Sequence, residues 1–229
     1  MLPHAIVFDF DGVLINSEPL HMRAMQQVLA DRGVRLTDEA YYARYLGYND
    51  EDAIGAIGAE YGQGFDEAEI LELAARKAAL LPSLLSAPGL WFGGAAECVR
   101  DLARHVPLAI ASGSKRHEIE LTLRAAGLRE LFAVIVASLE TARSKPAPDP
   151  YSRAVELLQQ HGLVPAGTGS VARCVAIEDS QWGIESARAA GLRCVAVASS
   201  YGRDELTAAD LVVDRIGDVT VSALERLVG

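Results

Sequence analysis

Two acidic residues alternate at the end of an apolar run near the start of the chain. The expected strand Ala5–Phe10 has Asp9 after four apolar residues, and Asp11 and Gly12 follow it. An Asp-x-Asp-Gly segment alone is as consistent with a surface turn as with chemistry, because Asp and Gly both favour turns. A catalytic function requires that distant residues supply what two crowded carboxylates need.

Three later apolar runs also end in polar residues. Ligands of an open parallel sheet bind outside the carboxyl ends of its strands, so we expect these residues to converge. They are Ser112, Gly113 and Ser114 after the run 107–111, Lys145 a few residues beyond the run 133–137, and Glu178 and Asp179 at the end of the run 174–177. Four strand ends would then deliver carboxylates, hydroxyls, an ammonium and open backbone amides to one crevice.

The charges of this group predict a bound cation. The four carboxylates outnumber the single ammonium of Lys145 and leave three uncompensated negative charges. Two like charges about 4 Å apart repel by roughly 4 kcal/mol even at an effective dielectric constant near 20. Without a cation, such pairs coexist only with large pKa shifts. Oxygen ligands of this kind suit Mg²⁺, which is commonly bound by one or two carboxylates together with a phosphate.

Lys145 and the residues after the run 107–111 predict an anion site beside that metal. Only three of the 21 basic residues are lysines, so a lysine at this position indicates a compact ammonium for a phosphoryl oxygen. Ser112, the Gly113 amide and the start of the following helix can hold the remaining oxygens. A small phosphorylated ligand is therefore the expected partner.

The elements that must position these residues fall into two parts of the chain with different sequence patterns. After the Pro88-Gly89 break, short apolar runs alternate with helical stretches, which predicts an α/β fold: a Rossmann-like parallel sheet with helices on both faces. Residues 17–87 instead show helical periodicity throughout. We therefore expect an α/β core domain of residues 1–16 and 88–229, with an inserted all-helical cap of residues 17–87.

Composition limits the partners of the protein. A net charge of −10 and a pI near 5.0 disfavour nucleic acid, whose phosphates bind basic surfaces. The three cysteines are widely spaced and lack a Cys-x-x-Cys pair, which is typical of reduced core thiols. The uncharged stretch 78–96 is interrupted by prolines and glycines, so it does not predict a membrane span. We expect a monomeric, cytoplasmic protein that binds neither nucleic acid nor membrane.

The ordered motifs resemble the haloacid dehalogenase superfamily, in its β-phosphoglucomutase-like branch with a helical cap after the first strand. Asp9-Phe-Asp-Gly-Val is similar to the first family motif, Ser112 to the second, Lys145-Pro to the third and Glu178-Asp179 to the fourth. The resemblance extends over essentially the whole chain. Four motifs in order are specific, whereas the first alone would not be.

The resemblance implies a role for each core residue. Asp9 would be the nucleophile that becomes an aspartyl-phosphate, and Asp11 would protonate the leaving oxygen and then deprotonate the acceptor. Mg²⁺ would be held by Asp9, the Asp11 backbone carbonyl and Asp179, with Glu178 binding directly or through water. An acid at position 11 favours phosphate esters, because the dehalogenases and phosphonate hydrolases of the superfamily lack it.

The resemblance leaves two reactions open, because the family includes phosphatases and sugar-phosphate mutases on the same core. The cap distinguishes the two. Its mutases carry a cap-loop arginine for a second phosphate, and this chain has acids there, Asp50 to Asp52. A second phosphate would be repelled there unless Arg44 or Arg23 reaches it. We therefore expect a Mg²⁺-dependent phosphatase of small phosphorylated metabolites, sugar phosphates first among them. The alternative is a β-phosphoglucomutase-type isomerase, and a catalytically inactive binding module is less favoured because every catalytic position is filled.

Three residues of the expected cap are candidates for substrate contact. Tyr48 and Asn49 precede the acidic segment in an expected loop, and His21 lies near the expected hinge. For His21 the sequence leaves two functions open, substrate contact or packing between cap and core.

Overall fold

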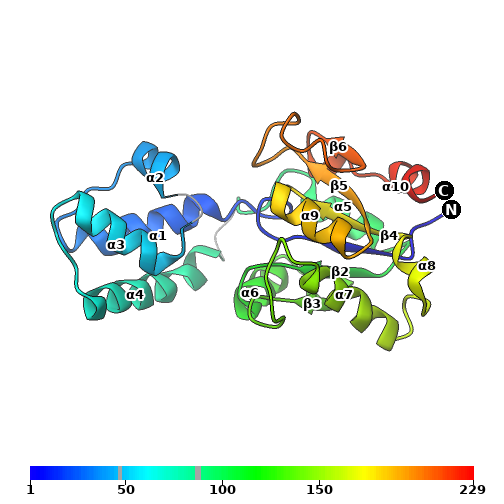
Figure 1. The fold of residues 1–229 in the computed structure, drawn as a ribbon, viewed down its shortest axis with the longest axis horizontal. Helices are drawn as coiled ribbons and strands as arrows, with labels where there is room; N and C mark the ends of the chain where they lie inside the picture. The colour runs from blue at the N-terminus through cyan, green and yellow to red at the C-terminus, as the bar shows by residue number, and fades with distance from the viewer. Residues whose placement is uncertain (46–47, 86–88) are drawn as a thin grey trace. The chain divides into compact units, whose positions relative to one another are not determined.

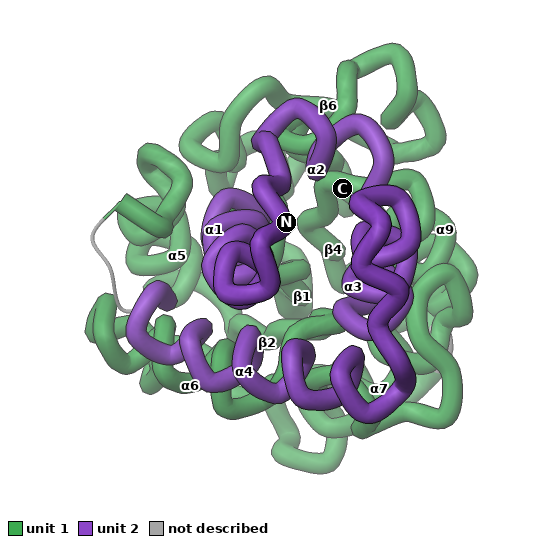
Figure 2. Tube along the Cα trace, turned by 90° about the vertical axis from the view of Figure 1, so that its left-hand side faces the viewer, with its two compact units in different colours: residues 1–16, 88–229 green, residues 17–87 purple. Residues whose placement is uncertain are grey.

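The computed structural model describes residues 1–45, 48–85 and 89–229, which form two compact units (Figures 1 and 2). Unit 1 combines residues 1–16 with 88–229, and unit 2 comprises residues 17–87. The second of the expected domain boundaries, between 87 and 88, lies outside the described residues.

Unit 1 is built around a parallel sheet. Within the described residues it has six strands in the order β3-β2-β1-β4-β5-β6, and all neighbouring pairs are parallel. The strands are β1 Ala5–Phe8, β2 Leu108–Ala111, β3 Phe132–Val136, β4 Cys174–Glu178, β5 Arg193–Val197 and β6 Leu211–Val213. The α/β class is confirmed. The expected runs 5–10, 107–111, 133–137 and 174–177 form β1 to β4, with ends that differ by one or two residues.

The central strands are buried on both faces, which explains their uninterrupted apolar sequences. Side chains alternate between the two faces along each strand. Val7, Ala109 and their counterparts pack with α7 (Asp149–Gln160) and α9 (Gln181–Ala189) in one cluster. On the alternate set of positions, the rings of Phe8 and Phe132 make an edge contact at 5.9 Å.

Further helices complete unit 1 between and after the strands. The α-helices are α5 Ala95–Leu102, α6 Arg116–Ala125, α8 Thr168–Val171 and α10 Val221–Val228, and the 3-10 turns are η1 Arg129–Leu131 and η2 Ile216–Asp218. The helix expected to follow Ser112 and Gly113 begins at Arg116, because Ser112, Gly113 and Ser114 form the loop after β2. That loop therefore places the Gly113 amide and the hydroxyls of Ser112 and Ser114 at the strand end.

Unit 2 is helical throughout its regular structure. Its helices are α1 Glu18–Ala30, α2 Asp38–Arg44, α3 Asp50–Glu60 and α4 Glu67–Leu85. Apolar side chains from all four, including Met25, Tyr41, Ile54 and Leu73, form a core of their own. Unit 2 thus has the independent apolar interior expected of a separately packed body. No helix among the described residues of either unit is long and apolar enough to cross a membrane.

Candidate active site

Asp9 lies where the strand order of the sheet changes direction. It directly follows β1, whose neighbours are β2 and β4, and its backbone N–H donates to the Ile177 carbonyl at 2.9 Å. This backbone bond continues the pairing of β1 with β4 past the end of β1 and fixes the direction of the Asp9 side chain. Crevices at such switch points are the usual ligand sites of open α/β sheets.

Lys145 bridges two of the predicted carboxylates. Its Nζ donates to Asp9 Oδ1 at 2.7 Å and to Glu178 Oε1 at 2.6 Å. Burial alone would lower the pKa of Lys145, but the adjacent carboxylates of Asp9 and Glu178 raise it above its ordinary value. The ammonium is therefore charged at any working pH and is aimed at Asp9.

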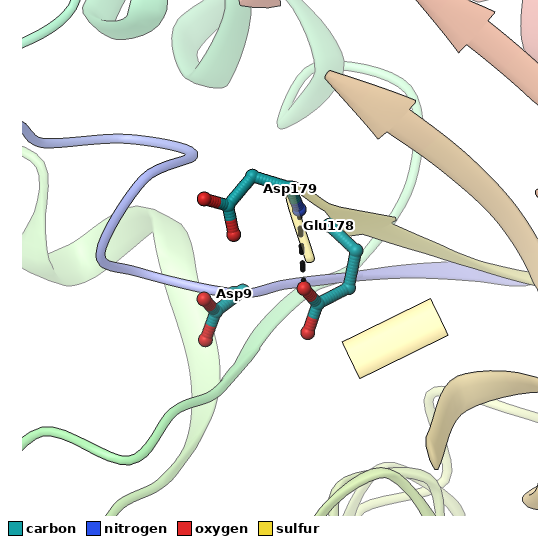
Figure 3. Close-up of side chains that lie close together, drawn as sticks. All are labelled: Asp9, Glu178 and Asp179. Carbon is teal, nitrogen blue, oxygen red and sulfur yellow. Dashed lines mark hydrogen bonds between the residues drawn. The ribbon is translucent and has the colours of Figure 1, made fainter. Parts of the chain in front are cut away.

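Glu178 is fully buried, and protein groups hold both of its carboxylate oxygens. Oε1 accepts from Lys145 and from the Tyr151 hydroxyl at 2.8 Å. Oε2 accepts from the backbone N–H of Asp179 at 3.1 Å (Figure 3) and from Ser180 Oγ at 3.2 Å. These contacts are what a buried carboxylate requires, because an unpaired charge in the interior is very costly.

Asp179 is tied to two neighbouring loops. Its Oδ2 accepts from the hydroxyl of Ser200, which follows β5, and a Cβ on Gly12 would lie only 1.9 Å from the same oxygen. Gly12 also has a φ of +77°, so glycine is required there for two reasons. Burial, reinforced by Glu178, raises the pKa of Asp179 to about 7.

The donor set fits a divalent metal. Among the described residues, one carboxylate oxygen from each of Asp9, Glu178 and Asp179 lies within 4.8 Å of the others, and Figure 3 shows the three side chains at the ends of β1 and β4. Burial, reinforced by Glu178 and Asp179, raises the pKa of Asp9 well above its ordinary value despite the attraction of Lys145. Buried oxygen ligands with excess negative charge are suited to a hard cation such as Mg²⁺.

The loop after β2 brings two hydroxyls and the second aspartate together. Ser112 Oγ accepts from the Ser114 N–H at 3.0 Å, and the Ser114 hydroxyl donates to Asp11 Oδ2. Ser112 is buried, and a Cβ built on Gly113 would meet no atom within 4 Å. Asp11 also forms an isolated bridge with Ile15, which holds the turn after β1. The structure thus brings together all of the candidate residues predicted in unit 1.

The candidates His21, Tyr48 and Asn49 belong to unit 2, and each has local contacts there. His21 Nδ1 lies 3.3 Å from Lys77 Nζ. Asn49 caps α3 by accepting from the Asp52 N–H at 2.9 Å, and Tyr48 is exposed with its ring against Tyr45. The capping bond gives Asn49 a structural role that the sequence reading did not assign.

Three contacts to the site residues come from side chains that the sequence reading missed. Ser199 and Ser200 lie two and three residues beyond the end of β5, and their hydroxyls donate to the Gly12 carbonyl and to Asp179. The rule that ligands gather at strand ends would have found both, because β5 is the neighbour of β4. Tyr151 is six residues beyond Lys145 inside α7, and no local pattern indicates its contact with Glu178.

The arrangement as a whole can bind an anion against a nucleophile. A buried carboxylate, Asp9, is held beside an ammonium, while a second carboxylate, Asp11, is hydrogen-bonded to a serine. Carboxylate nucleophiles split a difficult transfer into two easier steps, and a nearby acid can exchange protons in each. Phosphoryl transfer in particular depends on positioning and charge neutralisation of this kind.

Comparison with known proteins agrees with this geometry. The family model of haloacid dehalogenase-like hydrolases matches residues 3–191. The protein CbbY of Rhodobacter capsulatus is 33% identical over 231 residues, which cover 97% of this chain and 96% of that protein. The fructose-1-phosphate phosphatase YqaB of Escherichia coli (strain K12) is 29% identical over 195 residues, covering 84% of this chain and 95% of that protein.

A solved structure shares the whole fold. The crystal structure of CbbY from Rhodobacter sphaeroides in complex with phosphate matches with a TM-score of 0.79 and 29% identity, covering 98% of this chain and all 100% of that one. The family model covers the greater part of the sequence, including the site residues at the ends of β1, β2 and β4. The chain therefore belongs to the haloacid dehalogenase-like hydrolases.

Proposed function

We propose that this enzyme is a Mg²⁺-dependent phosphatase that hydrolyses small phosphorylated metabolites through an aspartyl-phosphate on Asp9. The observation that carries the proposal is the buried Asp9 carboxylate, bonded to the Lys145 ammonium at 2.7 Å and grouped with Glu178 and Asp179. The names of the relatives support the same reaction, since one is a fructose-1-phosphate phosphatase and a CbbY structure contains phosphate.

In the first step, a carboxylate oxygen of Asp9 attacks phosphorus and the ester P–O bond breaks. The departing oxygen takes a proton from Asp11, whose Oδ2 is oriented by the Ser114 hydroxyl. In the second step, Asp11 removes a proton from water, the water oxygen attacks the phosphoryl group, and inorganic phosphate leaves with the Asp9 carboxylate restored. A positioned acid and base of this kind typically contributes ~10²–10⁴-fold in rate.

Lys145, the Ser112 hydroxyl and the Gly113 amide would hold the phosphoryl oxygens, while the Ser114 N–H donates to Ser112 Oγ at 3.0 Å. The Lys145 ammonium supplies the charge, and the Ser112 hydroxyl lies in the loop that directly follows β2. Charge-assisted bonds to phosphoryl oxygens are roughly twice as strong as neutral ones.

Asp9, Asp179, Glu178 and the Asp11 backbone carbonyl would hold Mg²⁺. The bound cation supplies positive charge that offsets the carboxylate cluster and the incoming phosphate. The buried acidic group of Asp9, Glu178 and Asp179 supports this donor set.

We assign unit 1 as the α/β core domain and unit 2 as the helical cap that selects the substrate. Within unit 2, the buried Lys77 is paired with Asp50, and the exposed Arg44 is paired with Glu60. These cations are already neutralised by carboxylates, which supports a monophosphate substrate such as a sugar phosphate over the bisphosphate that a mutase handles.

The same proposal includes a monomer that works in the cytoplasm. The three cysteines are buried free thiols, as is usual in a reducing compartment. Light scattering coupled to size-exclusion chromatography measures the oligomeric state directly.

The deciding experiment measures phosphate release from a panel of phosphorylated metabolites, with Mg²⁺ or with excess chelator. The panel contains hexose and pentose monophosphates, a sugar bisphosphate and an aryl phosphate, and a coupled isomerase assay runs on the same samples. We expect Mg²⁺-dependent phosphate release from monophosphates without a bisphosphate activator. Fast isomerisation of β-glucose 1-phosphate with negligible phosphate release would identify a mutase, and full turnover in chelator by metal-free protein would refute the metal assignment.

A further inference from the structure

Tyr151 contacts two of the site residues without belonging to any strand end. It lies in α7 with no exposed surface, and its hydroxyl donates to Glu178 Oε1 at 2.8 Å. Lys145 also donates to Glu178 Oε1, and its Nζ lies over the Tyr151 ring, 5.0 Å from the ring centroid. One side chain therefore supports both members of the Lys145–Glu178 pair.

Packing alone does not explain a tyrosine here. The ring belongs to the apolar cluster between the sheet, α7 and α9, where phenylalanine would fill nearly the same volume without a polar atom. A buried phenol is favourable only where its hydroxyl finds a partner, and this partner is a fully buried carboxylate. The hydroxyl thus serves Glu178 and not the apolar core.

The shared acceptor couples the hydroxyl to the direction of Lys145. Glu178 Oε1 accepts from Lys145 at 2.6 Å and from Tyr151 at 2.8 Å, while Lys145 also donates to Asp9 at 2.7 Å. The phenol supplies part of the hydrogen bonding that this oxygen requires. The ammonium can then be shared with Asp9, and the ring beneath it adds a cation–π attraction.

We propose that Tyr151 is a positioning residue of the phosphoryl-transfer site, which holds Glu178 and Lys145 so that the ammonium reaches Asp9 and the bound phosphoryl group. This inference rests on the proposed phosphatase function. Without the hydroxyl, Glu178 Oε1 would draw Lys145 more strongly to itself and away from Asp9. The expected consequence is weaker binding of the phosphoryl group and slower transfer.

The test compares Tyr151→Phe, which keeps the ring, with Tyr151→Leu, which removes it. The matched control is Tyr45→Phe in unit 2, which deletes the same kind of hydroxyl bonded to a carboxylate, Glu60. Each protein is measured for kcat and KM on p-nitrophenyl phosphate, for melting temperature, and for calorimetric affinity for inorganic phosphate in Mg²⁺. A second route replaces Tyr151 by 3-fluorotyrosine, which retains a donor hydroxyl.

We expect Tyr151→Phe to lose ~10–100-fold in kcat and about tenfold in phosphate affinity. Losses of this size are usual when a side chain that hydrogen-bonds to a metal-ligating residue and orients it is replaced. Tyr151→Leu should lose more, because the ring beneath the ammonium is gone as well. Tyr45→Phe should keep wild-type kcat at a comparable change in melting temperature, and the fluorotyrosine protein should keep most of the activity. If Tyr151 had only a structural role, Tyr151→Phe would lower the melting temperature, but its kcat and phosphate affinity would equal those of the Tyr45→Phe control.

Wild-type kcat and phosphate affinity in a folded Tyr151→Phe protein would overturn the inference while leaving the phosphatase intact. If Tyr151→Phe does not fold, a tenfold loss in the folded fluorotyrosine protein would overturn it as well. A wild-type protein that binds Mg²⁺ and phosphate but hydrolyses nothing would overturn the proposed function alone. Phosphate affinity would then still decide the role of Tyr151.

Discussion

Replacing Asp179 by asparagine should stabilise the metal-free protein. The raised pKa of Asp179, about 7 against an ordinary value of 3.8, means that the folded state holds a proton that the unfolded chain releases. Because the folded state binds more protons between these two values, stability falls as pH rises from about 4 to about 7. Asparagine has nearly the same shape, can accept from the Ser200 hydroxyl, and carries no charge.

The size of the effect follows from the same shift. Three pKa units correspond to on the order of 4 kcal/mol, and the coupling of Asp179 to Asp9 and Glu178 reduces the part that a single substitution recovers. We expect Asp179→Asn to gain about 2–4 kcal/mol at pH 8 in chelator and almost nothing at pH 4. For a chain of this size that is a rise in melting temperature of roughly 5–10 °C.

The assay is thermal unfolding of wild type, Asp179→Asn and the control Asp204→Asn, at pH 4 and pH 8, with chelator or Mg²⁺. Asp204 is exposed, so its substitution makes the same change in net charge without burial. Mg²⁺ should stabilise the wild type at pH 8 and have a much smaller effect on Asp179→Asn, because one ligand is missing. A loss of stability in chelator at pH 8, or an equal gain at both pH values, would refute the electrostatic reasoning.

The remaining predictions concern the reaction and the packing around it. Asp9→Asn should abolish turnover while the circular dichroism spectrum stays native, because an amide cannot accept the phosphoryl group; near-native turnover would exclude the covalent route. Asp11→Asn should lower kcat ~10²–10⁴-fold on sugar phosphates and much less on aryl phosphates, whose leaving groups depart without a proton, and equal losses would count against Asp11 as the acid. Gly183→Ala should reduce both Mg²⁺ affinity by calorimetry and activity, because the added Cβ would lie 1.9 Å from the Glu178 carboxylate; unchanged Mg²⁺ affinity would show that the carboxylate can move aside.

Much of the fold and of the site at the strand ends could be predicted from the sequence, for a simple physical reason. A parallel sheet covered by helices requires short apolar runs, and such a sheet aligns the carboxyl ends of its strands along one edge. Polar residues after those runs, such as Asp9, Ser112 and Glu178, therefore had to meet wherever the strands paired. The strand order seen in the structure places the ends of β1, β2 and β4 next to one another.

The helical insertion of residues 17–87 could also be predicted from the sequence, for a related reason. Its apolar positions recur at helical spacing, and α1 to α4 pack those positions into a core of their own. Sequence spacing does not specify which charged groups pair inside such a bundle. The contacts of Lys77 with Asp50 and His21 join α4 to residues 27 and 56 positions earlier, and only the packed structure shows them.

What the tertiary structure decided is how each acidic group in unit 1 is held. Asp9, Glu178 and Asp179 are all carboxylates in the sequence, yet each has a different set of partners. Asp9 accepts from Lys145, Glu178 from both Lys145 and Tyr151, and Asp179 from Ser200. Those partners come from separate loops and helices, and a contact of this kind depends on side-chain direction and burial after folding. Residue type and spacing determined which side chains meet at the strand ends. Burial and long-range hydrogen bonds determined the protonation of those carboxylates and the direction in which they point.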